Sequence, residues 1–302
     1  MNGPPAMRPP LRAYAALVVM TIAFGGTFVA TKVALRGFEP LLIAFVRFVV
    51  AGAILWLVWR WRGEREAVTR RELGRLAALG FVSLTVYFTF ENVGIAHTSA
   101  SDAAILIATV PIFVLIVNAV TTRERTSGGQ WLGVALSFAG VVALVELGAR
   151  GVEGTSLGGD LLVLAASLAG AVYTVMARRL LVTRSALFVT TFQNLFGALF
   201  MAPLAVVEAA AVGVKTPTAA ASSAVLYLAL LGSVVAYLLL NYGLRFVAAA
   251  QAAAFTNVIP IVAVVAAFVV LGERFTVGQA LAAIVVLAGV FLANRTAPLG
   301  RG

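Results

Sequence analysis

The sequence predicts an all-α integral membrane protein, in which ten transmembrane helices form two inverted repeats of five helices each. Three observations support this prediction. Of the 302 residues, 62% are hydrophobic and only 11% are charged, which is roughly half the charged fraction of a soluble domain. Apolar runs of about 20 residues, each long enough to cross a bilayer as a helix, recur along the chain. The second half of the chain also repeats the residue pattern of the first half.

Ten predicted spans follow from the apolar runs. The N-terminal stretch MNGPPAMRPPLR is polar, proline-rich and basic. It lacks the pattern of a cleavable signal peptide, so we expect it to lead directly into span 1. In chain order, the predicted spans are 13–35, 40–60, 74–97, 99–121, 128–147, 157–179, 185–207, 221–244, 248–271 and 276–295.

The lysines and arginines predict the orientation of these spans. With the N-terminus placed in the cytoplasm, sixteen of the 22 basic residues fall inside and four outside, while Lys32 and Arg47 lie within spans. The positive-inside rule therefore predicts that both termini are cytoplasmic. The same clustering in alternate loops accounts for the net charge of +10 without a nucleic-acid partner. We expect a multi-pass protein of a bacterial inner (cytoplasmic) membrane, surrounded by the lipid bilayer.

An internal repeat is visible when the sequence is shifted by 149 residues. The stretch ENVGIAHTSASDAAILIATVPI then lies over LNYGLRFVAAAQAAAFTNVIPI. Asn92 meets Asn241, and Pro111 meets Pro260. These are uncommon residue types in a sequence this apolar, so shared composition does not explain the match.

The earlier spans match more weakly, at a shift of about 146 residues, which places Arg47 over Gln193. We therefore divide the chain into a first repeat, 1–149, and a second repeat, 150–302, each with five spans. Because five is odd, the second repeat must enter the membrane in the opposite orientation. Inverted repeats of this kind recur in secondary transporters.

The chain resembles the drug/metabolite transporter superfamily, in its ten-span EamA-type branch, through the stretches IAFGGTFVATKVAL, FVRFVVAGAIL, HTSASDAAILIATVPIF and NVIPIVAVVAAFVVLGERFTVGQALAAIVVLAGVFLA. Within that branch it is most similar to bacterial exporters of aromatic amino acids. The resemblance implies a secondary transporter that exports small organic metabolites by alternating access. The same resemblance implies that aromatic and other large apolar amino acids are the expected substrates.

Two alternatives to amino-acid export stay open at this point. The first is a multidrug or cationic-compound exporter of the same superfamily. The second, from another class, is a membrane scaffold or sensor that transports nothing. The sequence leaves the oligomeric state open, including a monomer. It also leaves open whether transport is coupled to an ion.

Enzymatic activity is not expected. The sequence contains no GxxxxGK[ST] phosphate-binding loop and no GxSxG nucleophile turn. It has one histidine and no cysteine, which is too few ligands for a typical protein metal site. We therefore predict no catalytic residue, no metal and no cofactor.

Two opposite charges are predicted at similar depths in neighbouring spans. At a rise of 1.5 Å per residue, Arg47 in span 2 lies about 10 Å below the outer surface, and Glu91 in span 3 about 9 Å. Because isolated charges are costly there, the sequence predicts that the two side chains form a pair. The pair could lock spans 2 and 3 together, contact the substrate or gate its passage, or couple transport to protons.

Polar and aromatic residues of spans 1–4 and 6–9 are predicted to build a cavity at the repeat interface. An amide in such a helix can instead bond to a neighbouring helix, and an aromatic ring can simply pack. We expect neutral groups to bind the charged ends of an amino acid and Glu91 to act in assembly or gating. The candidate substrate-binding residues are Thr27, Thr31, Tyr87, Phe90, Asn92, Tyr173, Gln193, Asn194, Tyr237, Asn241, Thr256 and Asn257.

Spans 5 and 10 carry no charge or amide in mid-membrane, so we expect them to be peripheral. A contact between subunits could form there through Ala139-Gly140 and Ala288-Gly289.

Pro111 and Pro260 lie in the middle of spans 4 and 9, where a proline removes a backbone hydrogen bond and kinks the helix. Their matching positions predict hinges for gating, with a static kink as the alternative.

Overall fold

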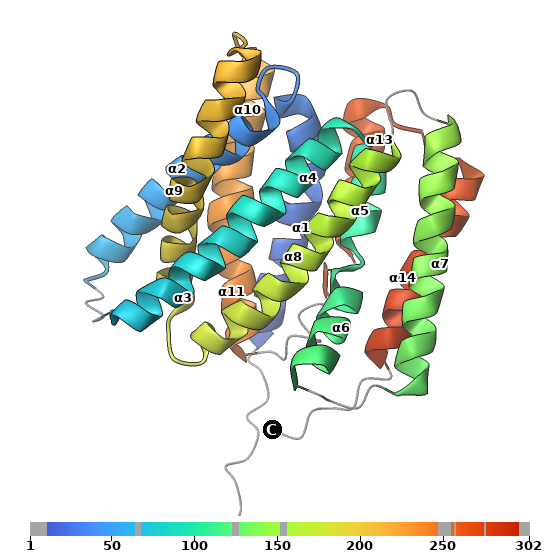
Figure 1. Cartoon of the computed structure of the whole chain (residues 1–302), viewed down its shortest axis with the longest axis horizontal. Coiled ribbons are helices and arrows are strands. Elements are labelled where there is room, and N and C mark those ends of the chain that lie inside the picture. Colours follow the sequence, from blue (N-terminus) through green and yellow to red (C-terminus); the bar gives the residue numbers. More distant parts are fainter. Residues whose placement is uncertain are drawn as a thin grey trace, which may run out of the picture.

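The protein folds as a bundle of long helices, seen here in a computed structural model (Figure 1). The structure describes residues 11–63, 68–122, 127–151, 156–246, 255–256, 258–274 and 276–295. Within these ranges every regular element is a helix. The elements are α1 (Leu11–Ala34), α2 (Pro40–Trp61), α3 (Arg70–Gly80), η1 (Phe81–Val86), α4 (Tyr87–Ala96), α5 (Ala100–Ile107), α6 (Val110–Thr122), α7 (Gly128–Gly151), α8 (Leu157–Leu181), α9 (Ala186–Val212), α10 (Ala219–Tyr227), η2 (Leu228–Ala236), α11 (Tyr237–Phe246), α13 (Ile259–Leu271) and α14 (Val277–Arg295).

Eight helical segments of the described chain are long and apolar enough to cross a membrane. They are α1, α2, α3 to α4, α5 to α6, α7, α8, α9 and α10 to α11. Two shorter apolar helices, α13 and α14, follow. Each long segment coincides with one of the first eight predicted spans. The largest difference in their ends is in α9, which continues to Val212 instead of ending at 207. The protein is therefore a multi-pass membrane protein.

The fourth long segment is broken at its proline rather than only kinked. α5 ends at Ile107, and α6 begins at Val110 with Pro111 as its second residue. Proline lacks an N–H group and disfavours helical backbone in the residue before it, which explains the break. The carbonyl oxygen of Leu106 accepts hydrogen bonds from the Thr109 hydroxyl at 2.6 Å and the Ser167 hydroxyl at 3.0 Å. The broken end is thus satisfied inside the bundle.

The second proline occupies the same place in its own helix. Pro260 is the second residue of α13. The carbonyl oxygen of Phe255, before α13, accepts a hydrogen bond from the Thr21 hydroxyl of α1 at 3.1 Å. Phe255 lies 149 residues after Leu106, and Ser167 lies 146 residues after Thr21. The same contact is therefore made twice, at positions that the two sequence shifts relate.

Two long segments also contain a π-helical stretch in mid-helix. η1 separates α3 from α4, and η2 separates α10 from α11. Each stretch presents a buried serine to the other half of the chain. Ser83 in η1 accepts a hydrogen bond from Gln193 Nε2 at 3.0 Å, and Ser233 in η2 accepts one from Arg47 Nε at 2.9 Å. Such π-helical stretches frequently occur at functional sites.

α7 and α14, which are predicted spans 5 and 10, lie side by side at the edge of the bundle (Figure 1). A Cβ atom added to Gly140 would lie 2.6 Å from the backbone nitrogen of Val286, and one added to Gly289 would lie 2.3 Å from that of Ser137. Only glycine allows the two backbones to approach this closely. These two glycines pack α7 against α14 within the chain, so they do not themselves form the expected subunit contact, which stays a prediction for the exposed Ala139 and Ala288.

Candidate functional site

A cavity of about 90 Å³ lies at the centre of the bundle. A single water needs about 10–15 Å³ of such space, so the cavity can accommodate several water-sized groups. Its lining residues are Phe24, Thr27, Phe28, Arg47, Tyr87, Phe88, Glu91, Ile107, Val110, Gly170, Tyr173, Thr174, Tyr237, Leu240, Leu244, Thr256 and Ile259. They come from spans 1–4, 6, 8 and 9, so most of the predicted spans contribute. Among the described residues, α9 adds none.

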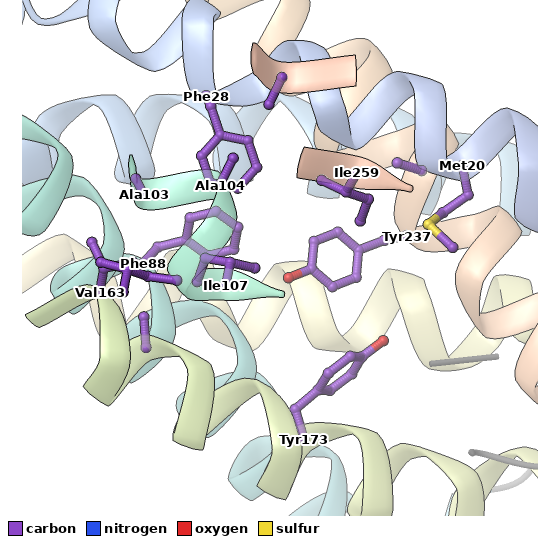
Figure 2. Packing of buried hydrophobic residues seen from close by; sticks show 14 of the residues in the cluster. Met20, Phe28, Phe88, Ala103, Ala104, Ile107, Val163, Tyr173, Tyr237 and Ile259 are labelled. Carbon is purple, nitrogen blue, oxygen red and sulfur yellow. The ribbon is translucent and has the colours of Figure 1, made fainter. Parts of the chain in front are cut away.

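Aromatic rings form much of the cavity wall. Phe88, Tyr173 and Tyr237 come from three different helices and surround a common space together with Ile107 and Ile259 (Figure 2). The ring centroids of Tyr173 and Tyr237 are 5.8 Å apart with a steep interplanar angle of 67°. Edge-to-face contacts of this kind hold the rings in fixed orientations. The wall is therefore apolar, rigid and suited to a planar or bulky apolar group.

Arg47 of α2 is the cation of this cavity and is only 1% exposed. Its Nε donates to Ser233, and its guanidinium carbon lies 4.4 Å from the centre of the Phe88 ring, a distance that allows a cation–π interaction. A Cβ atom on Gly232 would lie 2.7 Å from Nη2, so this glycine leaves room for the guanidinium. Nη1 and Nη2 have no hydrogen-bond partner among the described residues.

Glu91 of α4 is the anion of the same cavity and is 5% exposed. Its Oε1 accepts a hydrogen bond from the Tyr87 hydroxyl at 2.8 Å. The direct ion pair expected from the matching depths is absent from the described contacts of Arg47 and Glu91. Depth in the membrane determines the position of a residue along its helix. It does not determine the direction in which the side chain points around the helix axis, so equal depth does not ensure a contact. The two charges instead face the cavity, where each still lowers the electrostatic cost of the other.

Asn92 and Asn241 bond to neighbouring helices and do not line the cavity. Asn241 accepts from the Tyr173 hydroxyl at 2.9 Å and donates to the Thr190 hydroxyl at 2.9 Å. Asn92 donates to the carbonyl oxygen of Pro40 at 2.9 Å. Asn92 therefore links α4 to α2, and Asn241 links α11 to α9. This bonding between helices is the alternative to substrate binding that the sequence leaves open.

The remaining predicted residues separate into three groups. Thr27 and Thr256 line the cavity. Asn257 lies outside the described residues. The other predicted residues that are absent from the cavity lining are Thr31, Phe90, Gln193, Asn194, Pro111 and Pro260.

Sequence reasoning missed Phe24, Phe88 and Ser233. The two phenylalanines look like packing residues in any apolar helix. Phe88, however, directly follows Tyr87 and lies three residues before Glu91, which places all three near one face of α4. Ser233 directly follows Gly232, the residue that the shift of 149 places over Ser83, so the repeat points to it only to within one residue.

A bundle of long apolar helices around a cavity with charged and aromatic walls is the architecture of a membrane protein that holds a small solute. The chain belongs to the EamA-like transporter family, whose sequence profile matches residues 11–145 and 157–295. It is therefore a transporter and not an enzyme.

Individual relatives agree with this assignment. The chain is 30% identical to the "Uncharacterized transporter YetK" of Bacillus subtilis, over 93% of this chain and 86% of that one. It is 31% identical to a "Probable terminal-alkyne amino-acid exporter" of Streptantibioticus cattleyicolor, over 96% and 95% of the two chains. A crystal structure with 18% sequence identity matches with a TM-score of 0.66, covering 93% of this chain and 96% of the other. That match shows a shared fold.

Proposed function

We propose that this transporter exports amino acids with aromatic or other large apolar side chains, by alternating access, across a bacterial inner membrane. The observation that carries the proposal is the composition of the central cavity, which combines one cation, one anion and aromatic walls. A free amino acid has complementary parts: a carboxylate, an ammonium group and a side chain. Small-molecule sites typically combine apolar walls with a few placed polar groups in this way.

The repeat supports the mechanism of alternating access. Repeats 1–149 and 150–302 would be related by inversion, so that one half can rock against the other. Two of the contacts that cross between the halves have a matching counterpart. Thr21 to Phe255 corresponds to Ser167 to Leu106, and Arg47 to Ser233 corresponds to Gln193 to Ser83.

The inversion itself has a direct test. Cysteines introduced singly near Arg150 and Lys215 should react with a membrane-impermeant reagent added outside intact cells. Cysteines near Arg70 and Arg179 should react only after the membrane is opened. Labelling of all four from one side would contradict the inverted arrangement.

The broken helices support a site at the centre of the bundle. Ile107 and Val110 flank the first break, Thr256 and Ile259 lie at the second, and all four line the cavity. Transporters often place their substrate where discontinuous helices meet near the middle of the membrane. The N-terminal ends of α6 and α13 also direct the positive ends of their helix dipoles toward this region.

A cationic drug suits the cavity less well than an amino acid. Its positive charge would meet the buried guanidinium of Arg47, whereas the zwitterion presents a partner to both charges. The Streptantibioticus cattleyicolor relative, which is named as an amino-acid exporter, favours the same choice.

The test is counterflow in proteoliposomes of the purified protein. Labelled phenylalanine and tryptophan should accumulate in vesicles preloaded with the unlabelled amino acid, and protein-free vesicles should show no such uptake. Uptake of tetraphenylphosphonium without any uptake of amino acids would replace the proposal by the multidrug alternative. Absence of exchange for phenylalanine and tryptophan would contradict the proposed substrates.

A further inference from the structure

The two halves of the chain place different side chains at one matching position. Arg47 of α2 and Gln193 of α9 are 146 residues apart, the shift that relates the early spans of the two repeats. Each donates a hydrogen bond to a serine in the π-helical stretch of the opposite half. The contact between helices is thus conserved within the chain, and only one of its two copies carries a charge.

The neutral copy is closed. Gln193 donates to Ser83, and its Oε1 accepts from Asn241 Nδ2 at 3.3 Å. Asn241 Oδ1 in turn accepts from the Tyr173 hydroxyl. Both amides are 0% exposed, and both ends of each amide have a partner within the protein. This copy therefore has no polar group left for a ligand.

The charged copy is open. Arg47 is as deeply buried as its neutral counterpart, yet Nη1 and Nη2 make no hydrogen bond to any described residue. Buried donors without partners are costly, and more so on a charged group. Ser233 holds the guanidinium at its Nε edge and Phe88 holds it at its face, while Gly232 has no side chain to block Nη2. The Nη edge is left for a ligand in the cavity that Arg47 lines.

The chemistry of the missing partner follows from the shape of the donor. A guanidinium offers parallel N–H groups that match the two oxygens of a carboxylate. Glu91 lines the same cavity and has only the Tyr87 hydroxyl as a described hydrogen-bond partner. Its carboxylate can therefore accept an ammonium group. The cavity therefore offers the Nη atoms of Arg47 to an anionic group and the carboxylate of Glu91 to a cationic group, and the two side chains do not bond to each other.

We propose that Arg47 binds the carboxylate of an α-amino acid through Nη1 and Nη2, and that Glu91, positioned by Tyr87, binds its ammonium group. This assignment rests on the proposed amino-acid transport and names the residues that select the substrate. Under this assignment the two charged side chains select zwitterions, because a solute binds tightly only when it carries both an acidic and a basic group. The amides Asn92 and Asn241 have no direct part in recognition.

The wild-type protein alone can test the assignment with a series of ligands. Phenylalanine carries both groups, 3-phenylpropionate lacks the ammonium group, and phenethylamine lacks the carboxylate. Thermal unfolding of the purified protein in detergent, followed over a range of ligand concentrations, gives the affinity of each. We expect both analogues to bind about 10- to 100-fold more weakly than phenylalanine, the loss expected for one charge-assisted contact. Phenethylamine binding as tightly as phenylalanine would overturn the role of Arg47.

Two substitutions assign the loss to particular residues. Arg47→Gln introduces the side chain that the neutral copy has at this position. It should lower the affinity for phenylalanine and for 3-phenylpropionate at least about tenfold, and it should leave the affinity for phenethylamine unchanged. Glu91→Gln should lower the affinity for phenylalanine and for phenethylamine and leave the affinity for 3-phenylpropionate unchanged. The matched control is Arg60→Gln, at the exposed end of α2, which should leave all three affinities unchanged. If Arg47→Gln does not fold, the wild-type ligand series still decides the question.

Failure of this assignment is distinguishable from failure of the proposed function. If Arg47→Gln weakens all three ligands equally while proteoliposomes still exchange phenylalanine, the assignment is wrong and the transport stands. If the ligand series behaves as expected but no vesicle exchanges amino acids, the site is as assigned and the proposed transport is wrong. If phenylalanine does not bind at all, both are wrong.

Discussion

The two copies of the helix-to-serine contact share a framework but differ in charge. In one copy, here the charged side, Arg47 bonds to Ser233 and lines the cavity together with Glu91. In the other, here the neutral side, Gln193 bonds to Ser83 and Asn241, outside the cavity lining. The serine contact occurs on both sides, so holding two helices together does not require a charge. The charge must then serve a purpose that only one side has. The open Nη edge of Arg47 indicates that this purpose is to bind a solute.

The largest expected effect comes from removing the acid on the charged side. Glu91→Gln leaves Arg47 as the only charge of the cavity, and an uncompensated charge within the membrane costs at least about 2.5 kcal/mol. We expect a lower yield of folded protein and a rate of phenylalanine counterflow at least about tenfold lower per folded molecule.

The matched control for this substitution is Glu72→Gln, which loses an ion pair with Arg184 at the end of α3. Partly exposed pairs of this kind contribute only about 0–1 kcal/mol, so counterflow should stay close to that of the wild type. Equal counterflow rates in Glu91→Gln and wild type would contradict a role for the charged side.

A substitution on the neutral side should affect stability and not selectivity. Asn241→Ala removes the partner of Tyr173, Thr190 and Gln193, and buried groups left without partners cost about 1–3 kcal/mol each. The thermal unfolding temperature should fall, while phenylalanine should remain preferred over phenethylamine by the same ratio. A changed ratio would show that the neutral side also contacts the substrate.

The two serines allow a finer comparison of the sides. Ser233 accepts from a charged donor and Ser83 from a neutral one, and these bonds contribute about 1.5–3 and about 0.5–1.5 kcal/mol respectively. Ser233→Ala should loosen Arg47 and weaken phenylalanine binding. Ser83→Ala should lower the unfolding temperature and leave phenylalanine affinity unchanged. Similar affinities in the two variants would show that Ser233 does not position the guanidinium.

The helix breaks should differ least between the halves, because Pro111 and Pro260 occupy the same position in α6 and α13. If each break bends during transport, Pro111→Ala and Pro260→Ala should slow counterflow by similar factors, with phenylalanine affinity and protein yield unchanged. Counterflow rates are the measurement, taken for both single variants and the double variant. Wild-type rates in all three would show that the breaks are static.

The positions of the helices could be predicted from the sequence because a bilayer imposes one length on every apolar run. The π-helical stretches η1 and η2 could not, since their residues resemble those of any other apolar helix. The breaks at Pro111 and Pro260 were predicted as kinks, because a proline shows where a backbone bond is lost. It does not show that the Ser167 hydroxyl will bond to the carbonyl oxygen of Leu106, or the Thr21 hydroxyl to that of Phe255.

The roles of the polar residues were harder to predict than their presence. The sequence predicts Tyr87, Tyr173 and Tyr237 at the cavity, and they line it. It predicts an ion pair of Arg47 with Glu91, and both instead line the cavity. Whether an amide is free for a ligand depends on partners that are distant in the chain. Thr190, for example, is 51 residues from Asn241. The direction of each side chain around its helix axis decides this, and the sequence shows only its depth.

The most direct test of substrate binding by Arg47 and Glu91 is to determine where a bound amino acid lies in the structure. A crystal structure with 4-iodophenylalanine would locate the iodine by its anomalous signal and orient the molecule. Our account predicts the carboxylate within hydrogen-bonding distance of Arg47 Nη1 and Nη2, the ammonium group next to Glu91, and the ring against Phe88, Tyr173 and Tyr237. A carboxylate bound at Gln193 and Asn241, or an amino acid outside the central cavity, would contradict it.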